Sequence, residues 1–240
     1  MKMKLRRFGT DYGGFYYPEN INNYLNSKSI IYCVGAGEDI SHDIELAREL
    51  NSKIFIFDPT PRAIEHVNDV INVFNNKKEF QHNQKLGGGD KNYWNILLDN
   101  KINTENIIFK NYGLGCKNGF FKFYKPSNND HVSCSLVEGM KGTDYINVEI
   151  KDLNTIMNEL NHTKLDLLKI DIEGLECDVI NKMLDDNIFP KLLSVDFDLA
   201  GNGEKIKDEK KCIETINRLI SNNYKLLYQQ NLDFSFIYLN

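Results

Sequence analysis

The amino-acid sequence predicts an α/β fold, a doubly wound and mostly parallel sheet of seven strands closed by an antiparallel hairpin at the carboxyl end of the chain. Two observations predict it. Short apolar runs alternate with segments of helical periodicity, which is typical of parallel strands joined by crossover helices. The last two runs, Tyr224–Gln229 and Phe234–Leu239, are joined by a turn that is too short for a parallel return, so they are expected to be antiparallel.

Composition argues against several classes of protein. The 240 residues are enough for one α/β domain with a sizeable core. A net charge of −5 argues against a broad nucleic-acid surface, so no nucleic-acid partner is expected. No apolar run approaches the roughly 20 residues of a membrane span, and the basic start at residues 2–7 lacks the apolar stretch of a signal peptide. Five scattered cysteines without a CxxC pair predict reduced thiols and a cytoplasmic protein; no oligomeric state is indicated.

The chain is expected to divide into an N-terminal arm or flap at 1–28 and one domain at 29–240. The arm has no clear period but is rich in glycine and aromatic residues, so it either packs on the domain or covers the ligand. Insertions interrupt the domain at about 75–104 and 117–150. Gly87–Gly89 in the first insertion is expected to be a flexible loop, because it follows no strand and lacks the Lys-Ser/Thr of a phosphate loop.

The first half of the domain predicts strands and helices from their different periods. Apolar runs of four to six residues indicate buried strands, and apolar residues three or four positions apart indicate helices. Ser41 is expected to cap the first helix and Thr60 the second, in which Pro61 takes the first helical position. The expected strands are Ile30–Val34, Lys53–Phe57 and Ile107–Asn111, and the expected helices are Asp43–Leu50, one from Pro61 to about Phe74, and a short one around Tyr93–Leu98.

The second half continues the alternation after an added β segment. Asp152 is expected to cap a short helix that runs to Leu160. The expected strands are Gly119–Lys125, Tyr145–Ile150, Leu165–Ile170 and Leu192–Val195, and the expected helices after Leu160 are Leu175–Leu184 and Lys207–Ser221.

A glycine turn between the first strand and the first helix predicts a ligand site. Gly35 and Gly37 allow unusual backbone angles and leave room for a ligand against the main chain, and the helix that follows points its amide groups back at the same place. Asp58 stands at the end of the next strand, where a carboxylate can accept both hydroxyls of a ribose. We therefore expect a cofactor that contains a nucleoside.

Two cofactors compete for this site. A dinucleotide-binding turn carries a third glycine, but Ile40 occupies that place. A dinucleotide-binding sheet also continues with a parallel sixth strand, whereas this chain ends in a tight hairpin, the arrangement of S-adenosylmethionine-dependent methyltransferases. The sequence favours S-adenosylmethionine over NAD, and an NAD-dependent sugar oxidoreductase or epimerase stays the alternative.

Three motifs, in order, carry a resemblance to a known family. Tyr32–Ser41, Phe57–Ala63 and Leu167–Gly174 together resemble the FkbM family of methyltransferases, over roughly residues 30–200. The resemblance implies a class I, Rossmann-like methyltransferase fold that uses S-adenosylmethionine. It also implies methylation of hydroxyl groups, often on sugars of glycans or glycosylated products, and therefore a carbohydrate acceptor.

The resemblance also implies which residues bind the cofactor. The glycine turn would lie against its methionine and ribose, Asp58 would hold the ribose, the backbone around Tyr112–Leu114 would meet adenine, and Asp171 would face the transferred methyl group. The expected cofactor-binding residues are Gly35, Ala36, Gly37, Glu38, Asp39, Asp58, Pro59, Tyr112, Gly113, Leu114 and Asp171.

One position departs from the family pattern. Cys33 stands two residues before Gly35, where such enzymes often have an acidic residue that binds the amino group of the cofactor. Glu38, Asp39 or Asp171 is expected to take over that contact. Cys33 is also the one feature that favours a further alternative, a non-catalytic sugar-binding module on the same fold.

Catalysis requires activation of a sugar hydroxyl, which is a poor nucleophile at neutral pH. Either a general base or a divalent metal ion such as Mg²⁺ can supply it, and the sequence leaves both open. Acidic residues gather at the carboxyl ends of the expected strands Leu165–Ile170 and Leu192–Val195, where ligands bind in open α/β sheets. Glu173 and Asp198 could instead only cap or ion-pair with neighbouring helices, and His131 could be a solvated loop residue. The candidate catalytic residues are Asp171, Glu173, Asp196, Asp198 and His131.

Overall fold

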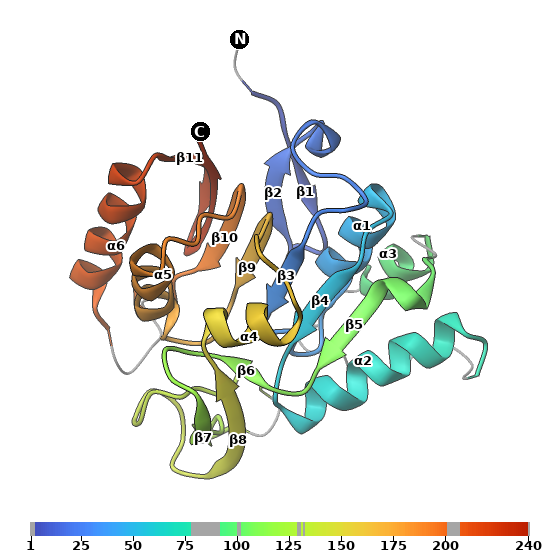
Figure 1. Ribbon diagram of the computed structural model, residues 1–240. Helices are drawn as coiled ribbons and strands as arrows, with labels where there is room; N and C mark the ends of the chain where they lie inside the picture. The colour runs from blue at the N-terminus through green and yellow to red at the C-terminus, as the bar shows by residue number, and fades with distance from the viewer. Residues whose placement is uncertain are drawn as a thin grey trace.

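Apolar runs form the central sheet of the computed structural model, which describes residues 3–77, 92–99, 102–128, 131, 133–200 and 207–239. The sheet confirms the predicted fold class (Figure 1). Its parallel strands are β3 (Ile31–Val34), β4 (Ile54–Phe57), β5 (Ile107–Lys110), β9 (Leu167–Ile170) and β10 (Leu192–Asp196). The hairpin of β11 (Tyr224–Gln230) and β12 (Asp233–Tyr238) closes it, with β12 antiparallel to β10, in the order β11-β12-β10-β9-β3-β4-β5.

The register of the strands brings their carboxyl ends level. Val34 of β3 lies opposite both Phe57 of β4 and Ile170 of β9. In the same way, Val195 of β10 lies opposite Ile170. The residues that follow these positions therefore emerge together at one edge of the sheet, as expected for parallel strands.

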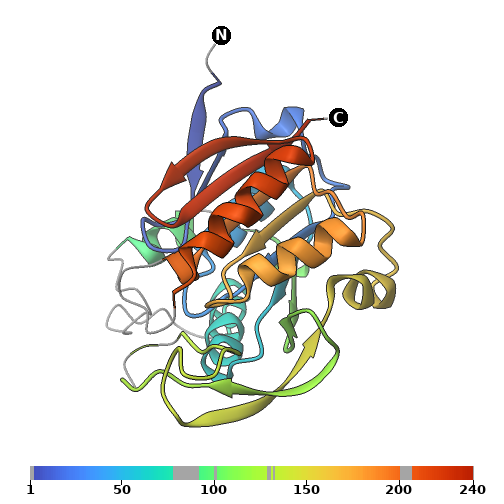
Figure 2. The ribbon, with the colours of Figure 1, turned by 90° about the vertical axis from the view of Figure 1, so that its left-hand side faces the viewer.

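Helices cover both faces of the sheet because successive side chains of a strand point to opposite faces. Tyr32 and Val34 pack in one core, whereas Ile31 and Cys33 pack in the other. The first core contains side chains of α4 (Leu153–Glu159), α5 (Glu176–Asp185) and α6 (Glu209–Ser221), and Figure 2 shows α5 and α6 side by side over this face. The second core contains those of α1 (Ser41–Leu50), α2 (Pro61–Phe74) and α3 (Tyr93–Asp99). Of the helices in the described ranges, none has the length and apolar character to cross a membrane.

The N-terminal segment is more regular than its sequence indicated. It contains a hairpin of β1 (Leu5–Phe8) and β2 (Phe15–Pro18), followed by a short 3₁₀ helix, η1 (Ile21–Asn23). Phe8, Phe15 and Tyr17 are buried in the core on the α1 face. The hydroxyl of Tyr17 accepts a hydrogen bond from Ser194 Oγ of β10 at 2.8 Å. The hairpin is therefore packed into the domain, and the turn between its strands reaches the edge where the parallel strands end.

The second insertion forms a small sheet of its own. β8 (Tyr145–Lys151) pairs parallel with β6 (Gly113–Leu114) and antiparallel with β7 (Gly119–Tyr124). Figure 1 shows it below the carboxyl ends of the central strands. The first insertion contains α3 and a 3₁₀ helix, η3 (Thr104–Asn106), while its predicted loop at Gly87–Gly89 lies outside the described residues.

The starts of the helices confirm two of the three predicted caps. Thr60 Oγ1 accepts from Ala63 N at 3.4 Å and Asp152 Oδ1 from Thr155 N at 2.8 Å. The prediction for Ser41 is wrong, because Ser41 is the first helical residue of α1 and Ile40 precedes it without a side-chain cap. Asp39 takes that role, since its Oδ1 accepts from Ser41 N at 2.9 Å and from Ser41 Oγ at 2.6 Å.

Candidate functional site

A cavity opens where β3, β4, β9 and β10 end, between the glycine turn and the small sheet. Every residue expected to bind the cofactor lines it except Tyr112, whose ring is buried against Phe57, with a centroid separation of 5.6 Å. Of the expected catalytic residues, Asp171, Glu173 and Asp196 line it, and Asp198 and His131 do not. The lining residues that were expected are Gly35, Ala36, Gly37, Glu38, Asp39, Asp58, Pro59, Gly113, Leu114, Asp171, Glu173 and Asp196.

The glycine turn is held against the end of β9. Gly35 has φ of +82°, and a Cβ there would lie 1.8 Å from the carbonyl oxygen of Asp171. Only glycine fits both the angle and the contact. The ammonium group of Lys169 donates a hydrogen bond to the carbonyl oxygen of Gly35. The turn and the Asp171 backbone are therefore in direct contact.

Asp58 binds the glycine turn through its side chain. Its Oδ2 accepts from the amides of Ala36 and Gly37 at 3.0 Å each, and its Oδ1 accepts from the amide and hydroxyl of Thr60 at 2.8 and 2.6 Å. These four hydrogen bonds match the acceptor capacity of a carboxylate. Burial raises the pKa of Asp58, and the hydrogen bonds oppose that rise. A ribose at Asp58 would therefore share or displace bonds that already position the turn.

Two of the residues expected to hold an amino group already have partners. Glu38 forms a bidentate ion pair with Arg62, with both nitrogen–oxygen distances at 2.8 Å. Asp39 is buried and its Oδ2 accepts from the hydroxyl of Thr10 at 2.5 Å, which attaches the N-terminal segment to the turn. Asp171 differs from them, because its side chain is 35% exposed.

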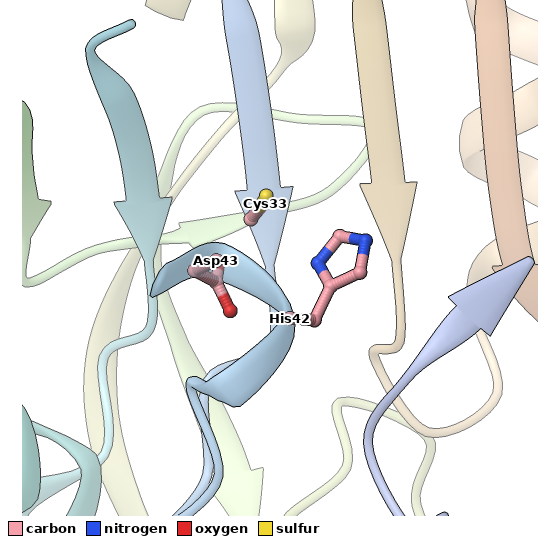
Figure 3. Close-up of side chains that lie close together, drawn as sticks. All are labelled: Cys33, His42 and Asp43. Carbon is pink, nitrogen blue, oxygen red and sulfur yellow. The ribbon is translucent and has the colours of Figure 1, made fainter. Parts of the chain in front are cut away.

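Cys33 points away from the cavity. Figure 3 shows its side chain with those of His42 and Asp43, between β3 and the first turn of α1. All three are buried, and one potential ligand atom of each lies within 4.8 Å of the others. Burial raises the pKa of Cys33 and lowers that of His42, and it raises the pKa of Asp43 to about 6. Cys33 therefore belongs to the core beneath the turn and does not change the lining of the cavity.

Lys169 is a buried cation that sequence reasoning missed. It is 3% exposed, lines the cavity, and its Nζ lies 3.5 Å from Oδ2 of Asp171. Burial lowers the pKa of Lys169, but the carboxylates around it, led by Asp171 and Asp43, raise it more, so the net shift is upward. A lysine inside an otherwise apolar strand was the available signal, because lysine is almost never fully buried without a partner.

Carboxylates gather beside the turn, as expected from their positions directly after two of the predicted parallel strands. One oxygen each of Asp171, Asp196 and Asp198 lies within 4.8 Å of the others. Oδ1 of Asp196 and Oδ2 of Asp198 are buried and have no hydrogen-bond partner among the described residues. Burial and then the neighbouring carboxylates raise the pKa of Asp196 to about 9 and that of Asp198 to about 11. Asp198 begins a 3₁₀ helix, η4 (Asp198–Ala200). It pairs with no described lysine or arginine, so of its alternative roles the ion pair with a neighbouring helix is absent from the described residues.

The turn after β9 holds Glu173 in a strained conformation. Its φ is +58°, which is uncommon for a residue other than glycine. Its carbonyl accepts from Ser135 Oγ at 2.6 Å, and its carboxylate lies 2.7 Å from Nζ of Lys141. Burial and Asp171 raise the pKa of Glu173, and Lys141 opposes the rise. The ion-pair alternative for Glu173 is thus present, although the residue also lines the cavity.

Glu176 binds the backbone of this turn, and the sequence analysis did not identify it. It is fully buried at the start of α5, and its Oε1 accepts from the amides of Ile172 and Gly174 at 3.3 and 2.8 Å. Burial raises its pKa to about 8. An acidic residue in the first turn of a helix was the available signal, since it can accept from free amides at a helix start.

Tyr12 lies at the site and His131 does not. Tyr12, from the glycine- and aromatic-rich N-terminal segment, lines the cavity, and partial burial with the charges of Asp171 and Glu173 raises its pKa to about 12. His131 is exposed, and its carbonyl accepts a hydrogen bond from Arg62 Nη1 at 3.2 Å. The structure therefore brings Tyr12 to the site and leaves His131 outside it.

Comparison with family models gives a match over most of the chain. The model of the methyltransferase FkbM domain matches residues 31–208. Among curated proteins, none matches the chain. Among solved structures, the fibrillarin pre-rRNA processing protein of Methanococcus jannaschii is similar with a TM-score of 0.40 and 12% identity, over 98% of this chain and 82% of that chain. A likeness at that level adds nothing to the fold described above.

Proposed function

Because this chain belongs to the FkbM methyltransferase family and is therefore an S-adenosylmethionine-dependent methyltransferase, we propose that it methylates a hydroxyl of a sugar in a glycan or glycoconjugate. The observation that carries this proposal is the row of carboxylates on the cavity wall, Asp171, Glu173 and Asp196. Carboxylates accept hydrogen bonds from the hydroxyls of a sugar.

The cavity has the chemistry that the cofactor requires. We place the methionine and ribose against the turn at Gly35–Gly37 and the adenine near Pro59 and Leu114, which supply apolar surface. The side chain of Asp171 is 35% exposed, against 14% for that of Glu38, and we propose its carboxylate as the partner of the reacting hydroxyl. Support comes from its exposure and from the backbone contact between its residue and Gly35.

When bound, S-adenosylmethionine supplies a methyl group on a positively charged sulfur, and the acceptor oxygen displaces that sulfur in line, so the carbon–sulfur electron pair stays on sulfur. The residues of this chain must align the acceptor, and alignment can contribute roughly 7–11 kcal/mol. We propose that Asp171 accepts the hydroxyl proton, a step typically worth roughly 10²–10⁴-fold. A divalent cation held by the same carboxylates is the other means of activation.

The other functions weighed from the sequence have lost their support. Membership of a methyltransferase family argues against the hypothesis of an NAD-dependent oxidoreductase or epimerase. The hypothesis of a non-catalytic sugar-binding module depended on Cys33, which is buried and does not line the cavity. A cytoplasmic location remains a proposal. It is supported by the free cysteines, among them Cys177 and Cys212, whose sulfurs lie 3.4 Å apart and form no disulfide bond.

The experiment is a methyl-transfer assay on a panel of glycans and glycosylated small molecules. The protein is incubated with S-adenosylmethionine carrying an isotopically labelled methyl group, and products are identified by mass spectrometry. We expect one labelled methyl group on a sugar hydroxyl, with release of S-adenosylhomocysteine. Methylation confined to protein, nucleic-acid or lipid acceptors offered in parallel would contradict the proposed substrate class.

A further inference from the structure

The arrangement of carboxylates at the cavity edge fits a cation. We propose that Asp171, Asp196 and Asp198 form a binding site for a divalent cation of the Mg²⁺ or Mn²⁺ kind. One oxygen from each residue lies within 4.8 Å of the others. Two oxygens that share Mg²⁺ at about 2.0–2.1 Å can lie at most about 4 Å apart, and two that share Ca²⁺ at about 2.3–2.6 Å at most about 5 Å apart. The three side chains are therefore already close to the spacing of a shared ion.

A second observation is that two of these carboxylates have unsatisfied oxygens. Asp198 is 9% exposed, and its Oδ2 has no partner among the described residues. Oδ1 of Asp196 is buried and unpartnered in the same sense. An unpaired buried polar atom costs free energy, and a charged one costs more. A cation between these oxygens would supply the missing partner.

The neighbouring charges leave the same two residues uncompensated. Lys169 is closest to Oδ2 of Asp171, and Lys141 pairs with Glu173. Asp196 and Asp198 have no ion pair within the described ranges, while Asp233 lies opposite Asp196 in the sheet and adds another negative charge. The carboxylate of Asp171 therefore has a cationic neighbour in Lys169. No described cationic side chain would thus compensate Asp196 and Asp198 when they give up their protons to bind a metal ion.

The donor chemistry selects the kind of ion. A site made only of carboxylate oxygens suits Mg²⁺, Mn²⁺ or Ca²⁺, whereas thiolate and imidazole ligands favour softer metals. The group of Cys33, His42 and Asp43 is of the second kind. His42 Nε2 in that group lies 3.0 Å from the hydroxyl of Tyr17, inside the core and outside the cavity lining. It therefore serves as the internal comparison for the experiment.

The position of the cation gives it a role in the reaction. Asp171 and Asp196 line the cavity, and Asp198 is buried next to them without lining it. An ion held there could bind the acceptor hydroxyl and lower its pKa, a consequence that rests on the proposed function. The binding itself does not rest on it, because it is measured without methyl donor or acceptor.

In the experiment, the chelator-treated protein is titrated with MnCl₂ and with MgCl₂ by calorimetry. Its thermal unfolding temperature is also measured in each salt. Wild type should bind about one cation per chain and unfold at a higher temperature when it is bound. Asp198→Asn should weaken binding at least tenfold, because it removes a ligand charge while leaving the cavity lining in place. Asp196→Asn is the second variant, and both should fold, since each relieves repulsion between carboxylates. The matched control is Glu214→Gln, which removes an exposed carboxylate of α6 and should bind as wild type does.

Several results would overturn the site. One is wild type without saturable binding of Mn²⁺ or Mg²⁺ at millimolar concentration. Another is wild-type affinity in both Asp196→Asn and Asp198→Asn. A third is loss of binding in Asp43→Asn with retention in Asp198→Asn, which would move the ion to the buried group beneath the turn. Calorimetry with S-adenosylhomocysteine on the same samples tests the cofactor site separately, so failure of the cation site and of the methyltransferase proposal are distinguishable.

Discussion

Asp58 shows how a single residue carries a role that its position in the sequence only partly reveals. Its place at the end of β4 predicted a contact with ribose, but its carboxylate accepts four hydrogen bonds from the chain itself, two of them from the glycine turn. It therefore shapes the turn on which any cofactor must lie, whether or not it also contacts the sugar.

Replacing Asp58 should affect both stability and cofactor affinity. In Asp58→Ala, the amides of Ala36 and Gly37 lose their acceptor, and we expect a destabilisation of about 2 kcal/mol and at least tenfold weaker binding of S-adenosylhomocysteine. Urea unfolding and calorimetry measure the two effects. A loss of affinity without a loss of stability would instead indicate a direct ribose contact, and unchanged affinity would exclude both roles.

Asp171 differs from the other acidic residues near the turn because its side chain is 35% exposed. Asp171→Asn keeps the shape of the side chain and removes its basicity, so turnover should fall by roughly 10²–10⁴-fold with little change in the affinity for S-adenosylhomocysteine. The control is Asp186→Asn, which removes a carboxylate from the partly buried ion pair with Lys182 of α5, away from the cavity lining. Turnover of Asp171→Asn near that of the control would remove Asp171 from the reaction.

At the scale of elements, the site is assembled from the ends of strands and closed by segments outside the central sheet. The turn between β1 and β2 contributes Tyr12 and Gly13, and the small sheet contributes Phe123 and Ile150. Thr10 attaches the first of these segments to Asp39 of the glycine turn. The N-terminal segment thus has a defined attachment point beside the cavity, and that it covers the ligand stays a prediction.

That attachment can be tested with an isosteric change. Thr10→Val leaves Oδ2 of buried Asp39 without its partner, so the free energy of unfolding should fall by about 2 kcal/mol, and S-adenosylhomocysteine should bind more weakly if the segment covers the cofactor. Thr104→Val, which removes an exposed hydrogen bond to Asn75, is the control and should change neither quantity. Equal effects from the two variants, measured by urea unfolding and calorimetry, would contradict the role of Thr10.

At the scale of the whole molecule, the core on the α1 face contains buried histidines that make stability depend on pH. His66 of α2 contacts the hydroxyl of Tyr93 of α3, and burial lowers its pKa to about 4, against the weaker opposing charges of Glu38 and Asp69. The unfolded chain takes up a proton on this histidine near pH 6.5, but the folded chain does so only near 4. Stability from this group is therefore complete above about pH 6.5 and is lost as the pH falls towards 4.

The variant His66→Gln should remove that dependence in part. Between pH 7 and pH 4.5, its free energy of unfolding should fall by about 2 kcal/mol less than that of wild type. Chemical unfolding at the two pH values measures the difference. His131→Gln, which changes an exposed histidine, is the control and should lose as much stability as wild type. The same loss in His66→Gln would show that this histidine is not the titrating group.

The sequence by itself determined the strands and helices of the domain, the glycine turn and the acids at the strand ends. These features are local: apolar periodicity, two glycines directly after an apolar run at Gly35 and Gly37, and a carboxylate directly after an apolar run at Asp58 and Asp171. Their convergence also followed, because parallel strands in register end at one edge. Ser41 was misassigned as a cap because two side chains that can cap a helix, Asp39 and Ser41, stand close together at its start.

Only the tertiary structure decided which way these side chains face and whether they have partners. The direction of Cys33, the burial of Lys169, and the unpartnered oxygens of Asp196 and Asp198 all depend on residues far away in the chain. So does the packing of the N-terminal hairpin, whose contacts with α1 and β10 no local pattern encodes. Charge, burial and hydrogen bonding are set by neighbours in space, and these decided the chemistry of the site.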